Sequence, residues 1–303
     1  IGVAGWLSEG CNQSCSFCAI PSFKGKLHSR TLESLVKEVT NLVKKGYKDF
    51  SFVSQDSSSY LRDLGHNDGL EQLIDAVEKI DGVKTARILY LYPSTTTLNL
   101  IDKIADSKVF VNYFDMPLQH ISQNMLKIMK RGKGAEKLIE LMNYMRSKPN
   151  SFVRTTFIAG HPGESEEDFE ELCSFVEDFG FDRGNVFSYS DEEGTSAETR
   201  DDKIQQELID ERAEILGDII SQTTIKSLEN DIGKSFEVYI DGESEEHEYL
   251  LSARKTIWAP QIDGEIYIND NEDNIPIVFG EIYEVEATQL AGDKLLAKII
   301  RKV

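Results

Sequence analysis

The segment GVAGWLSEGCNQSCSFC, residues 2–18, places a short apolar stretch directly before three closely spaced cysteines. Residues 2–7 predict a buried strand, and a loop follows from Ser8 to Arg30. Loops between a strand and a helix mostly have about two to six residues, so a loop of this length is usually functional. The fold and the chemistry of the chain are therefore expected to meet in residues 8–30.

Strand and helix patterns alternate after this loop. The further predicted strands are residues 49–54, 84–91, 109–116, 151–158 and 182–189, and each is followed by a helical pattern, the last from about residue 201 to 229. Such alternation is typical of parallel strands joined by right-handed crossovers. Ligands of such folds bind at the carboxyl ends of the strands. The pattern by itself allows either a partial barrel or an open, flat sheet.

A different pattern begins near Asp231. Only short strands are predicted from there, at residues 235–240, 247–254, 264–269, 277–287 and 294–302. Turn signals such as Asp241-Gly242 and Asp263-Gly264 separate them. Five short strands in this length predict a small closed barrel of the oligonucleotide-binding (OB) type. The expected domains are residues 1–230, of the α/β class, and residues 231–303, which are all β.

Composition and charge exclude several classes of protein. The chain has 303 residues, 40% of them hydrophobic, and a net charge of −20. This charge repels phosphate and attracts basic partners, whereas nucleic-acid binders usually present a basic face. No apolar run approaches the length of a membrane span, and the first segment lacks the features of a signal peptide. The chain begins at Ile1, inside a predicted strand, so we expect a fragment of a longer protein.

Three of the four cysteines, Cys11, Cys15 and Cys18, follow the spacing C-x3-C-x2-C. This grouping favours a metal site in a reducing compartment, so a cytoplasmic location is expected. Three thiolates this close can hold three corners of a cubane iron–sulfur cluster and leave the fourth iron open. A zinc site with His28 as fourth ligand is one alternative, and three unrelated buried cysteines are another. Cys173 lies on the apolar face of a predicted helix and is interpreted as a core cysteine.

The cysteine loop, with an aromatic residue before its third cysteine, resembles the radical S-adenosylmethionine superfamily. Four further segments resemble its methylthiotransferase family: residues 18–27 (CAIPSFKGKL), 53–56 (VSQD), 115–120 (DMPLQH) and 154–164 (RTTFIAGHPGE). The Ile-Pro-Ser and Ser-Gln-Asp runs, together with residues 259–264 (APQIDG), resemble the type that modifies an aspartate of ribosomal small-subunit protein S-twelve. The transfer-RNA-modifying relatives carry different residues at the first two places.

This resemblance implies a fold and a reaction. The implied fold is an open (β/α)6 partial TIM barrel followed by the small β-barrel called TRAM. The implied cofactors are a [4Fe–4S] cluster on the three cysteines and S-adenosylmethionine. The reduced cluster would cleave this sulfonium, and the resulting radical would take hydrogen from the aspartate β-carbon, which then receives a methylthio group. A transfer-RNA methylthiotransferase and a non-catalytic zinc-bearing binding module are the alternative functions.

The resemblance also implies contacts with S-adenosylmethionine. The expected residues are Phe17, Gln55, Gln119, Arg154, Gly160, Pro162 and Gly163. Gln55 ends a strand where related enzymes hold the methionine amino group, and glycines let the backbone of residues 160–163 approach the adenosine part. The alternatives are a plug over the cluster for Phe17, a solvated residue at a strand end for Gln55, a structural salt bridge for Arg154, and an ordinary tight turn for residues 160–163. His120 is interpreted as a loop histidine bonded to backbone, with a proton relay as its alternative.

Partners are expected from the resemblance and from charge. The family carries an amino-terminal domain for a second [4Fe–4S] cluster, which we expect only in the full-length protein. The expected partners are ribosomal protein S-twelve, a basic protein substrate, and a reductant of flavodoxin or ferredoxin type. Residues 231–303 contain 16 Asp plus Glu and 7 Lys plus Arg, so the net charge of this segment is −9. The acidic turns at residues 243–248 and 270–273 are predicted to contact the basic protein, and neither transfer RNA nor a membrane is expected as a partner.

Overall fold

The computed structural model describes residues 2–271 and 274–303. The chain forms two compact units, one from residues 3–221 and one from residues 222–303 with the start of the chain. Ile1, which the sequence analysis places in a strand, lies outside the described residues. So do Glu272 and Asp273 of the predicted acidic turn.

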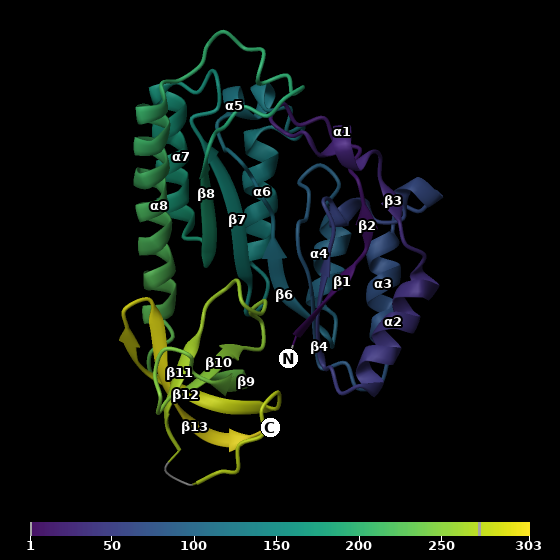
Figure 1. Ribbon diagram of the computed structural model, residues 1–303, viewed down its shortest axis with the longest axis vertical. Coiled ribbons are helices and arrows are strands. Elements are labelled where there is room, and N and C mark those ends of the chain that lie inside the picture. The colour runs from purple at the N-terminus through teal and green to yellow at the C-terminus, as the bar shows by residue number, and fades with distance from the viewer. Residues whose placement is uncertain (1, 272–273) are drawn as a thin grey trace. The chain divides into compact units, whose positions relative to one another are not determined.

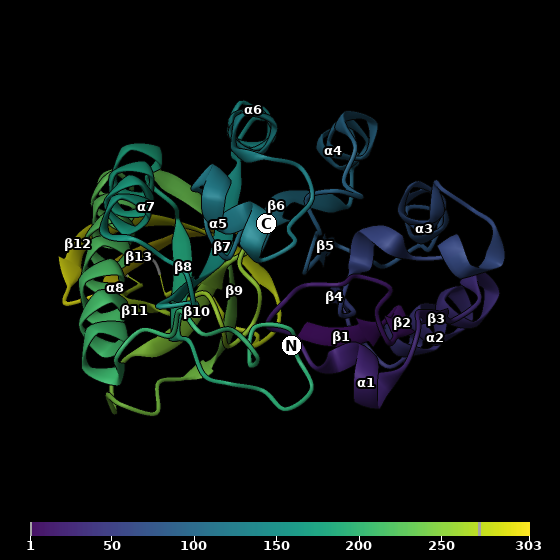
Figure 2. The ribbon, with the colours of Figure 1, turned by 90° about the horizontal axis from the view of Figure 1, so that it is seen from above.

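Six strands form one open sheet in the first unit, as the alternating pattern predicts. They are β1 (Gly2–Trp6), β4 (Asp49–Val53), β5 (Thr85–Ile88), β6 (Phe110–Asp115), β7 (Phe152–Ala159) and β8 (Arg183–Ser188), and they lie side by side in this order. The pairs from β4 to β8 are parallel. Because β1 and β8 form the two ends of the strand order, the sheet is open, and its strands follow an arc in Figure 2. The predicted partial barrel is thus confirmed.

Helices cover the outer face of this sheet, as Figure 2 shows. They are α2 (Leu32–Lys44), α3 (Gly69–Val77), α4 (Leu98–Ala105), α6 (Ala135–Arg146), α7 (Glu166–Phe179) and α8 (Gln206–Glu229). Local capping explains two of the helix starts. The Thr31 side chain accepts a hydrogen bond from the Ser34 amide before α2, and Ser165 and Asp168 form a capping box before α7.

Short elements lie at the carboxyl edge of the sheet, where α1 and α5 are seen toward the top of Figure 1. The long loop after β1 is partly ordered into β2 (Ser8–Glu9), α1 (Ile20–Lys24) and β3 (His28–Ser29), and β2 pairs with β3. The other short elements are the 3-10 helices Ser57–Ser59 and Arg62–Leu64 and helix α5 (Gln123–Ile128). The pairing of β2 with β3 closes the loop that carries the three cysteines.

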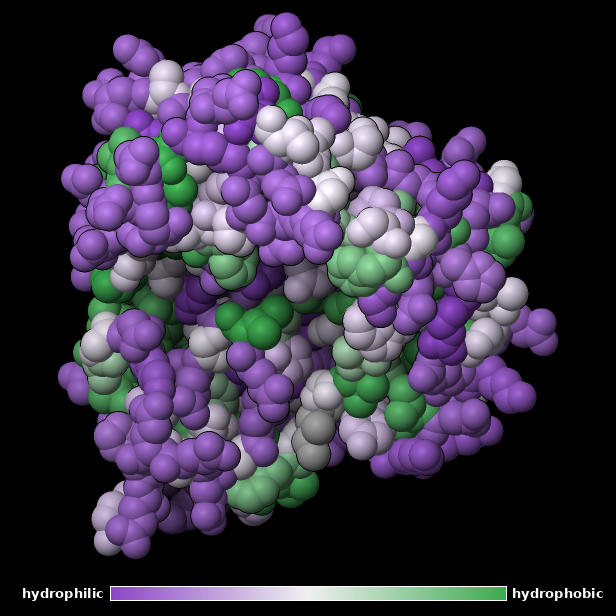
Figure 3. All heavy atoms as spheres, turned by 45° about the horizontal axis from the view of Figure 1, so that its top comes forward, coloured by the Kyte–Doolittle hydropathy of each residue, from purple (hydrophilic) through white to green (hydrophobic). Residues whose placement is uncertain are grey.

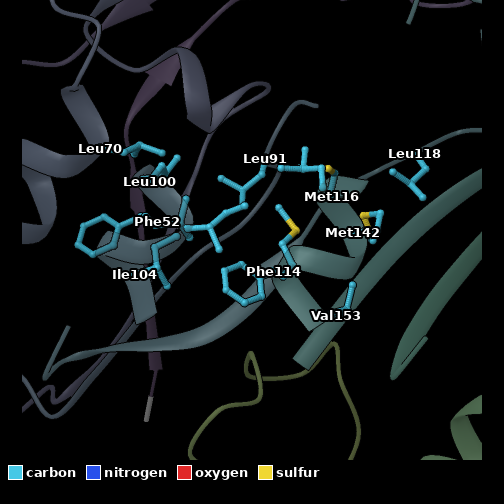
Figure 4. Packing of buried hydrophobic residues seen from close by; sticks show 14 of the residues in the cluster. Phe52, Leu70, Leu91, Leu100, Ile104, Phe114, Met116, Leu118, Met142 and Val153 are labelled. Atoms are coloured by element: carbon cyan, nitrogen blue, oxygen red, sulfur yellow. The ribbon is translucent and has the colours of Figure 1, made fainter. Parts of the chain in front are cut away.

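Apolar side chains fill the space between the sheet and its outer helices. Figure 4 shows Phe52, Leu70, Phe114 and Val153 among the buried residues of this core. Phe52 also stacks on Phe110, with the ring centroids 5.8 Å apart. A fully buried Leu or Phe side chain contributes about 1.5–3 kcal/mol. This shared core therefore fixes the strands, and with them the carboxyl ends that carry the candidate site.

A charged pair is buried inside this unit, between β4 and β5. The side chains of Arg87 and Asp49 are 0% and 1% exposed, and Arg87 Nη2 lies 2.7 Å from Asp49 Oδ1. The Thr85 hydroxyl donates to the same carboxylate oxygen (2.5 Å), and Arg87 Nη1 donates to the Ser51 hydroxyl (3.0 Å). Buried charges are tolerated in a core when they are paired and hydrogen-bonded in this way.

The second unit contains a closed five-stranded barrel, as the sequence predicts. Its strands are β9 (Ser235–Glu243), β10 (Leu251–Lys255), β11 (Ile266–Asp270), β12 (Ile282–Ala291) and β13 (Lys294–Lys302), joined in the order β10-β11-β13-β12-β9. Only β11 and β13 pair in parallel among the described barrel strands, and closure leaves no exposed strand edge in the barrel. In the part of the chain that the structure describes, no helix is long and apolar enough to cross a membrane.

The substitution Arg87→Met should lower the free energy of unfolding by about 3–5 kcal/mol, because it leaves the Asp49 charge buried without its partner. Lys103→Met is the matched control. Lys103 pairs with Asp75, and these side chains are 34% and 53% exposed. Because exposed pairs contribute about 0–1 kcal/mol, its loss should be small. Urea denaturation of both variants measures the two losses, and equal losses would contradict the assigned role of the buried pair.

Candidate metal centre and cofactor site

The three clustered cysteines lie in the loop between β2 and α1, at the carboxyl edge of the sheet. All three are free thiols of intermediate exposure. Burial raises the pKa of the Cys11 thiol to about 11. Burial also raises the pKa of the Cys18 thiol, whereas the nearby charge of Arg131 acts to lower it. Cys11 and Cys18 therefore stay protonated at neutral pH unless a bound cation offsets the loss of solvation, as metal binding does.

The three thiols lie close enough to one another to act on each other's charge. Beyond the effect of burial, the charges of Cys15 and Cys18 raise the pKa of Cys11, so the three thiols are neighbours. Among the described residues, however, no three His, Cys, Asp or Glu side chains converge as ligands of one metal ion. His28, the fourth ligand of the zinc alternative, is exposed on β3. Three neighbouring thiols can supply three corners of a cubane cluster, so this set of donors fits that group.

Backbone contacts hold the start of the cysteine loop. Gly10 has a φ of 71°, and a Cβ built on it would lie 2.2 Å from the Lys26 carbonyl oxygen. A residue with a side chain could not be placed there without moving the backbone. The Cys11 amide donates to the Gly25 carbonyl (3.2 Å). The first cysteine is thus held against the segment that leads into β3.

The buried carboxylate of Asp56 holds the middle of the loop. Asp56 follows β4 and is 2% exposed. Its Oδ2 accepts hydrogen bonds from Gln13 Nε2 (2.8 Å) and the Ser59 hydroxyl (2.6 Å), and its Oδ1 accepts one from the Ser58 hydroxyl (2.9 Å). Sequence reasoning used residues 54–56 as a family motif and missed this contact. A polar run directly after a buried strand was the signal that could have found it.

A neutral histidine holds the serine between the second and third cysteines. Ser16 Oγ lies 2.9 Å from His161 Nε2, and His161 Nδ1 lies 2.9 Å from the Pro162 carbonyl oxygen. A carbonyl oxygen only accepts, so Nδ1 carries the proton and Nε2 accepts from the serine hydroxyl. Burial lowers the pKa of His161, which favours this neutral form. Phe17 packs edge-on against the same imidazole, with ring centroids 6.2 Å apart.

Two further side chains reach Cys15 from distant parts of the chain. Arg131 Nη1 lies 3.4 Å from Cys15 Sγ, and the Tyr92 hydroxyl lies 3.7 Å from it. Arg131 follows α5 and Tyr92 follows β5, so the carboxyl edge of the sheet brings both to the loop. Sequence reasoning missed both residues, because neither belongs to a motif that it singled out.

Gln55 and Gln119, two predicted cofactor contacts, both lie at the carboxyl edge. The Oε1 atom of each is buried and has no hydrogen-bond partner among the described residues. Gln119 has a φ of 71°, and its backbone bonds to β7 through Thr156 (2.8 Å) and Ile158 (3.0 Å). A buried acceptor without a partner costs about 1–3 kcal/mol, so an N–H donor of a bound molecule would fit each oxygen.

The other predicted contacts have partners inside the protein. Arg154 Nη1 lies 3.1 Å from Asp115 Oδ1, so this guanidinium is part of a buried salt bridge. Gly160 has a φ of 80°, and a Cβ on it would lie 2.5 Å from the Ile209 side chain. Gly163 is likewise left-handed, with a φ of 88°. The left-handed backbone thus explains why positions 160 and 163 are glycine. The contact of this turn with a cofactor stays a prediction.

His120 lies in the interior, and Cys173 is a partly buried residue that packs against the core. His120 is fully buried, and its Nδ1 accepts from the Ser122 amide (3.0 Å). Its Nε2 lies 3.2 Å from Glu164 Oε1, and Glu164 Oε2 accepts from Arg212 Nη1 (2.8 Å). His120 is therefore bonded to backbone, as interpreted. Cys173 lies on α7, packs against the core, and has its pKa raised by burial to about 11.

His161→Gln should weaken the pH dependence of stability. An unfolded histidine has a pKa of about 6.5, and burial lowers this value in the folded state. The unfolded chain therefore binds more protons as pH falls below about 6.5, and the folded state loses stability there. The urea concentration at the unfolding midpoint should decrease when the pH is lowered from about 7.5 to about 5.5. This decrease should be smaller in His161→Gln than in the wild type. His28→Gln, which removes an exposed imidazole, is the control, and an unchanged fall in His161→Gln would contradict the assignment.

Two family models match the chain, one in each unit. The model of the radical SAM superfamily matches residues 7–176, and that of the TRAM domain matches residues 232–300. Solved structures that resemble the fold include the following two. Coproporphyrinogen III oxidase (HemN) from Escherichia coli has a TM-score of 0.55 at 14% identity, covering 73% of this chain and 52% of that chain. The radical SAM methyltransferase TsrM from Kitasatospora setae has a TM-score of 0.51 at 18% identity, covering 65% of this chain and 38% of that chain.

Sequence relatives are much closer. A protein from Aliarcobacter butzleri, called ribosomal protein uS12 methylthiotransferase RimO, is 79% identical over 297 residues, covering 97% of this chain and 67% of the relative. A protein of the same name from a Sulfurovum species is 61% identical over 296 residues, covering 98% of this chain and 67% of the relative. The chain therefore belongs to the radical SAM superfamily and, within it, to the RimO family of methylthiotransferases.

Proposed function

We propose that this chain carries the radical chemistry of an enzyme that adds a methylthio group to the β-carbon of an aspartate in ribosomal protein S-twelve (uS12). One observation carries the proposal. Cys11, Cys15 and Cys18 lie together on a loop at the carboxyl edge of the sheet, in a chain that is 79% identical to a RimO protein. We assign residues 1–230 to the radical SAM domain and residues 231–303 to the TRAM barrel.

The three cysteines would hold a [4Fe–4S] cluster and leave its fourth iron to S-adenosylmethionine. When bound, these groups supply the electron and the carbon–sulfur bond whose cleavage starts the radical reaction. The protein contributes the geometry. Gly10, Asp56 and His161 each hold a different part of the loop, so the thiols are positioned before the metal arrives.

The proposed contacts with S-adenosylmethionine follow from chemistry and place in the fold. The unpartnered oxygens of Gln55 and Gln119 suit N–H donors, such as the methionine ammonium group. Phe17 would lie against the adenine, and the backbone of residues 160–163, with Gly160, Pro162 and Gly163, would contact the adenosine part. Arg154 would face the cofactor carboxylate while it keeps its pair with Asp115.

The remaining components of the reaction lie outside this chain in our proposal. Three cysteines are in the loop and Cys173 is on α7, so the sequence has no further set of three for a second cluster. We assign that cluster to the amino-terminal domain of the full-length protein. The electron would come from a low-potential protein of flavodoxin or ferredoxin type, and a reducing cytoplasm is the proposed location.

Anaerobic reconstitution of the 303-residue chain should load about four irons and four sulfides per molecule. Under reduction, the loaded chain should convert S-adenosylmethionine to 5′-deoxyadenosine and methionine. Changing Cys11, Cys15 or Cys18 to Ala should remove most of the iron and this activity, because a corner of the cluster loses its thiolate. Cys173→Ala, which removes a thiol from α7, is the control. Loss of iron in this control, with iron retained in the other variants, would refute the ligand assignment.

The charge of the barrel supports a basic protein as substrate. Residues 231–303 carry nine more acidic than basic residues. Glu243, Glu245 and Glu248 are exposed around the connection from β9 to β10, whereas Glu246 is bonded to Tyr267 and Lys294. The face of the molecule in Figure 3 is mostly hydrophilic, with apolar patches between the hydrophilic residues. A surplus of acidic side chains steers basic partners by charge, whereas RNA binding depends on Lys and Arg at phosphates.

Replacing Glu243, Glu245 and Glu248 with Gln should slow association with isolated uS12 more than it speeds dissociation, because exposed charges act mainly on encounter. The wild-type affinity should also fall as salt rises. Surface-binding kinetics against uS12 and against bulk transfer RNA provide the measurement. The control changes Glu207, Glu211 and Glu214, three exposed residues of α8, to Gln, and so removes the same charge elsewhere. An equal effect of the control, or tighter binding to transfer RNA, would contradict the proposed docking surface.

A further inference from the structure

Arg131 is a buried cation in contact with one thiol of the cysteine loop. Arg131 is only 6% exposed to solvent. Nη1 donates to Cys15 Sγ (3.4 Å), and Nη2 donates to the Pro117 carbonyl oxygen. Contacts through both terminal nitrogens fix the plane of the guanidinium, so its charge is held at the sulfur rather than free to move away.

Tyr92 completes this arrangement. Its ring lies below the same guanidinium, with Arg131 Cζ 4.4 Å from the ring centroid. Its hydroxyl oxygen lies 3.7 Å from Cys15 Sγ. A phenol has an ordinary pKa of about 10 and keeps its proton at neutral pH, so the hydroxyl can donate to a thiolate. A cation and a neutral donor thus meet at the same sulfur.

Both groups are positioned by segments outside the cysteine loop. The Arg131 amide donates to the Leu126 carbonyl at the end of α5 (2.8 Å). The Tyr92 amide donates to the Ser58 hydroxyl (2.8 Å), which in turn donates to Asp56. The guanidinium and the phenol are therefore held in place by the fold, whichever state the thiol is in.

We propose that Arg131, together with Tyr92, is a positioning residue that makes the cluster at Cys15 easier to reduce. This rests on the proposed function, in which Cys15 is a cluster ligand. One-electron reduction adds a negative charge that the ligand sulfurs share. A buried cation and a hydrogen bond at such a sulfur favour the reduced state and raise the reduction potential. In a chain with a net charge of −20, Arg131 offsets a field that opposes the arrival of the electron.

The test compares the reduction potential of reconstituted variants of the whole chain. Arg131→Gln removes the charge, Arg131→Lys keeps it, and Tyr92→Phe removes only a hydroxyl. In an anaerobic titration followed by electron paramagnetic resonance, Arg131→Gln should lower the ratio of reduced to oxidised cluster about tenfold at a fixed potential, a shift of about 59 mV for a one-electron couple. Arg131→Lys should restore part of this ratio, and Tyr92→Phe should lower it by a smaller factor.

Iron content measured in the same samples separates the possible failures. Lys130→Gln removes a charge one residue away, on an exposed side chain that bonds Ser196, and should leave the potential unchanged. A fully loaded Arg131→Gln with the wild-type potential, or an equal shift in Lys130→Gln, overturns this inference alone. If Arg131→Gln does not load iron, the Tyr92→Phe variant tests the inference instead. A reduction potential of Tyr92→Phe equal to that of the wild type then overturns the inference. A wild-type chain that loads no four-iron cluster overturns the proposed function and this inference with it.

Discussion

The site depends on one requirement, that a carboxylate removed from water must have its hydrogen bonds satisfied by the protein. Asp56 is almost fully buried directly after β4. Its two oxygens accept hydrogen bonds from three segments. The donors are Gln13 in the cysteine loop, Ser58 and Ser59 in the 3-10 helix Ser57–Ser59, and Thr95 (3.4 Å) in the turn beyond β5. Three separate segments are thus bound to one charge. Removing that charge would release the loop, the helix and the turn together.

Backbone strain at the same edge has a related origin. Tyr90, just beyond β5, and Gln119, beyond β6, have φ values of 61° and 71° although neither is glycine. Conformations of this kind cost about 1–3 kcal/mol each and are retained where the surroundings fix them. The Tyr90 amide donates to Asp115 Oδ2 (3.1 Å), and its carbonyl accepts from the Ser57 amide (3.0 Å). The strands therefore end in turns whose shape is set by buried polar groups.

The sequence predicts those features that depend on neighbours along the chain. Buried parallel strands carry continuous apolar runs, so the six strands and the change to short strands near Asp231 could be found from pattern. The spacing of Cys11, Cys15 and Cys18 is equally local. Contacts between distant residues could not be found in this way. Such contacts depend on the register of the sheet, which composition and spacing do not specify. Examples are the salt bridge of Arg154, the packing of Ile209 against Gly160, and the approach of Arg131 to Cys15.

The contacts of the cysteine loop also set an order of events during synthesis. Cys15 bonds a residue 116 positions later, Ser16 bonds one 145 positions later, and the Ser16 carbonyl accepts from the Ala197 amide. Contacts of such long range form late, because the chain between them must first be ordered. The cysteines leave the ribosome before these partners do, and their surroundings cannot be complete until the last strand of the sheet and the turn after it have been made. Until then the three thiols are exposed to oxidation and to stray metal ions, so the growing chain is most vulnerable at the residues on which its chemistry relies.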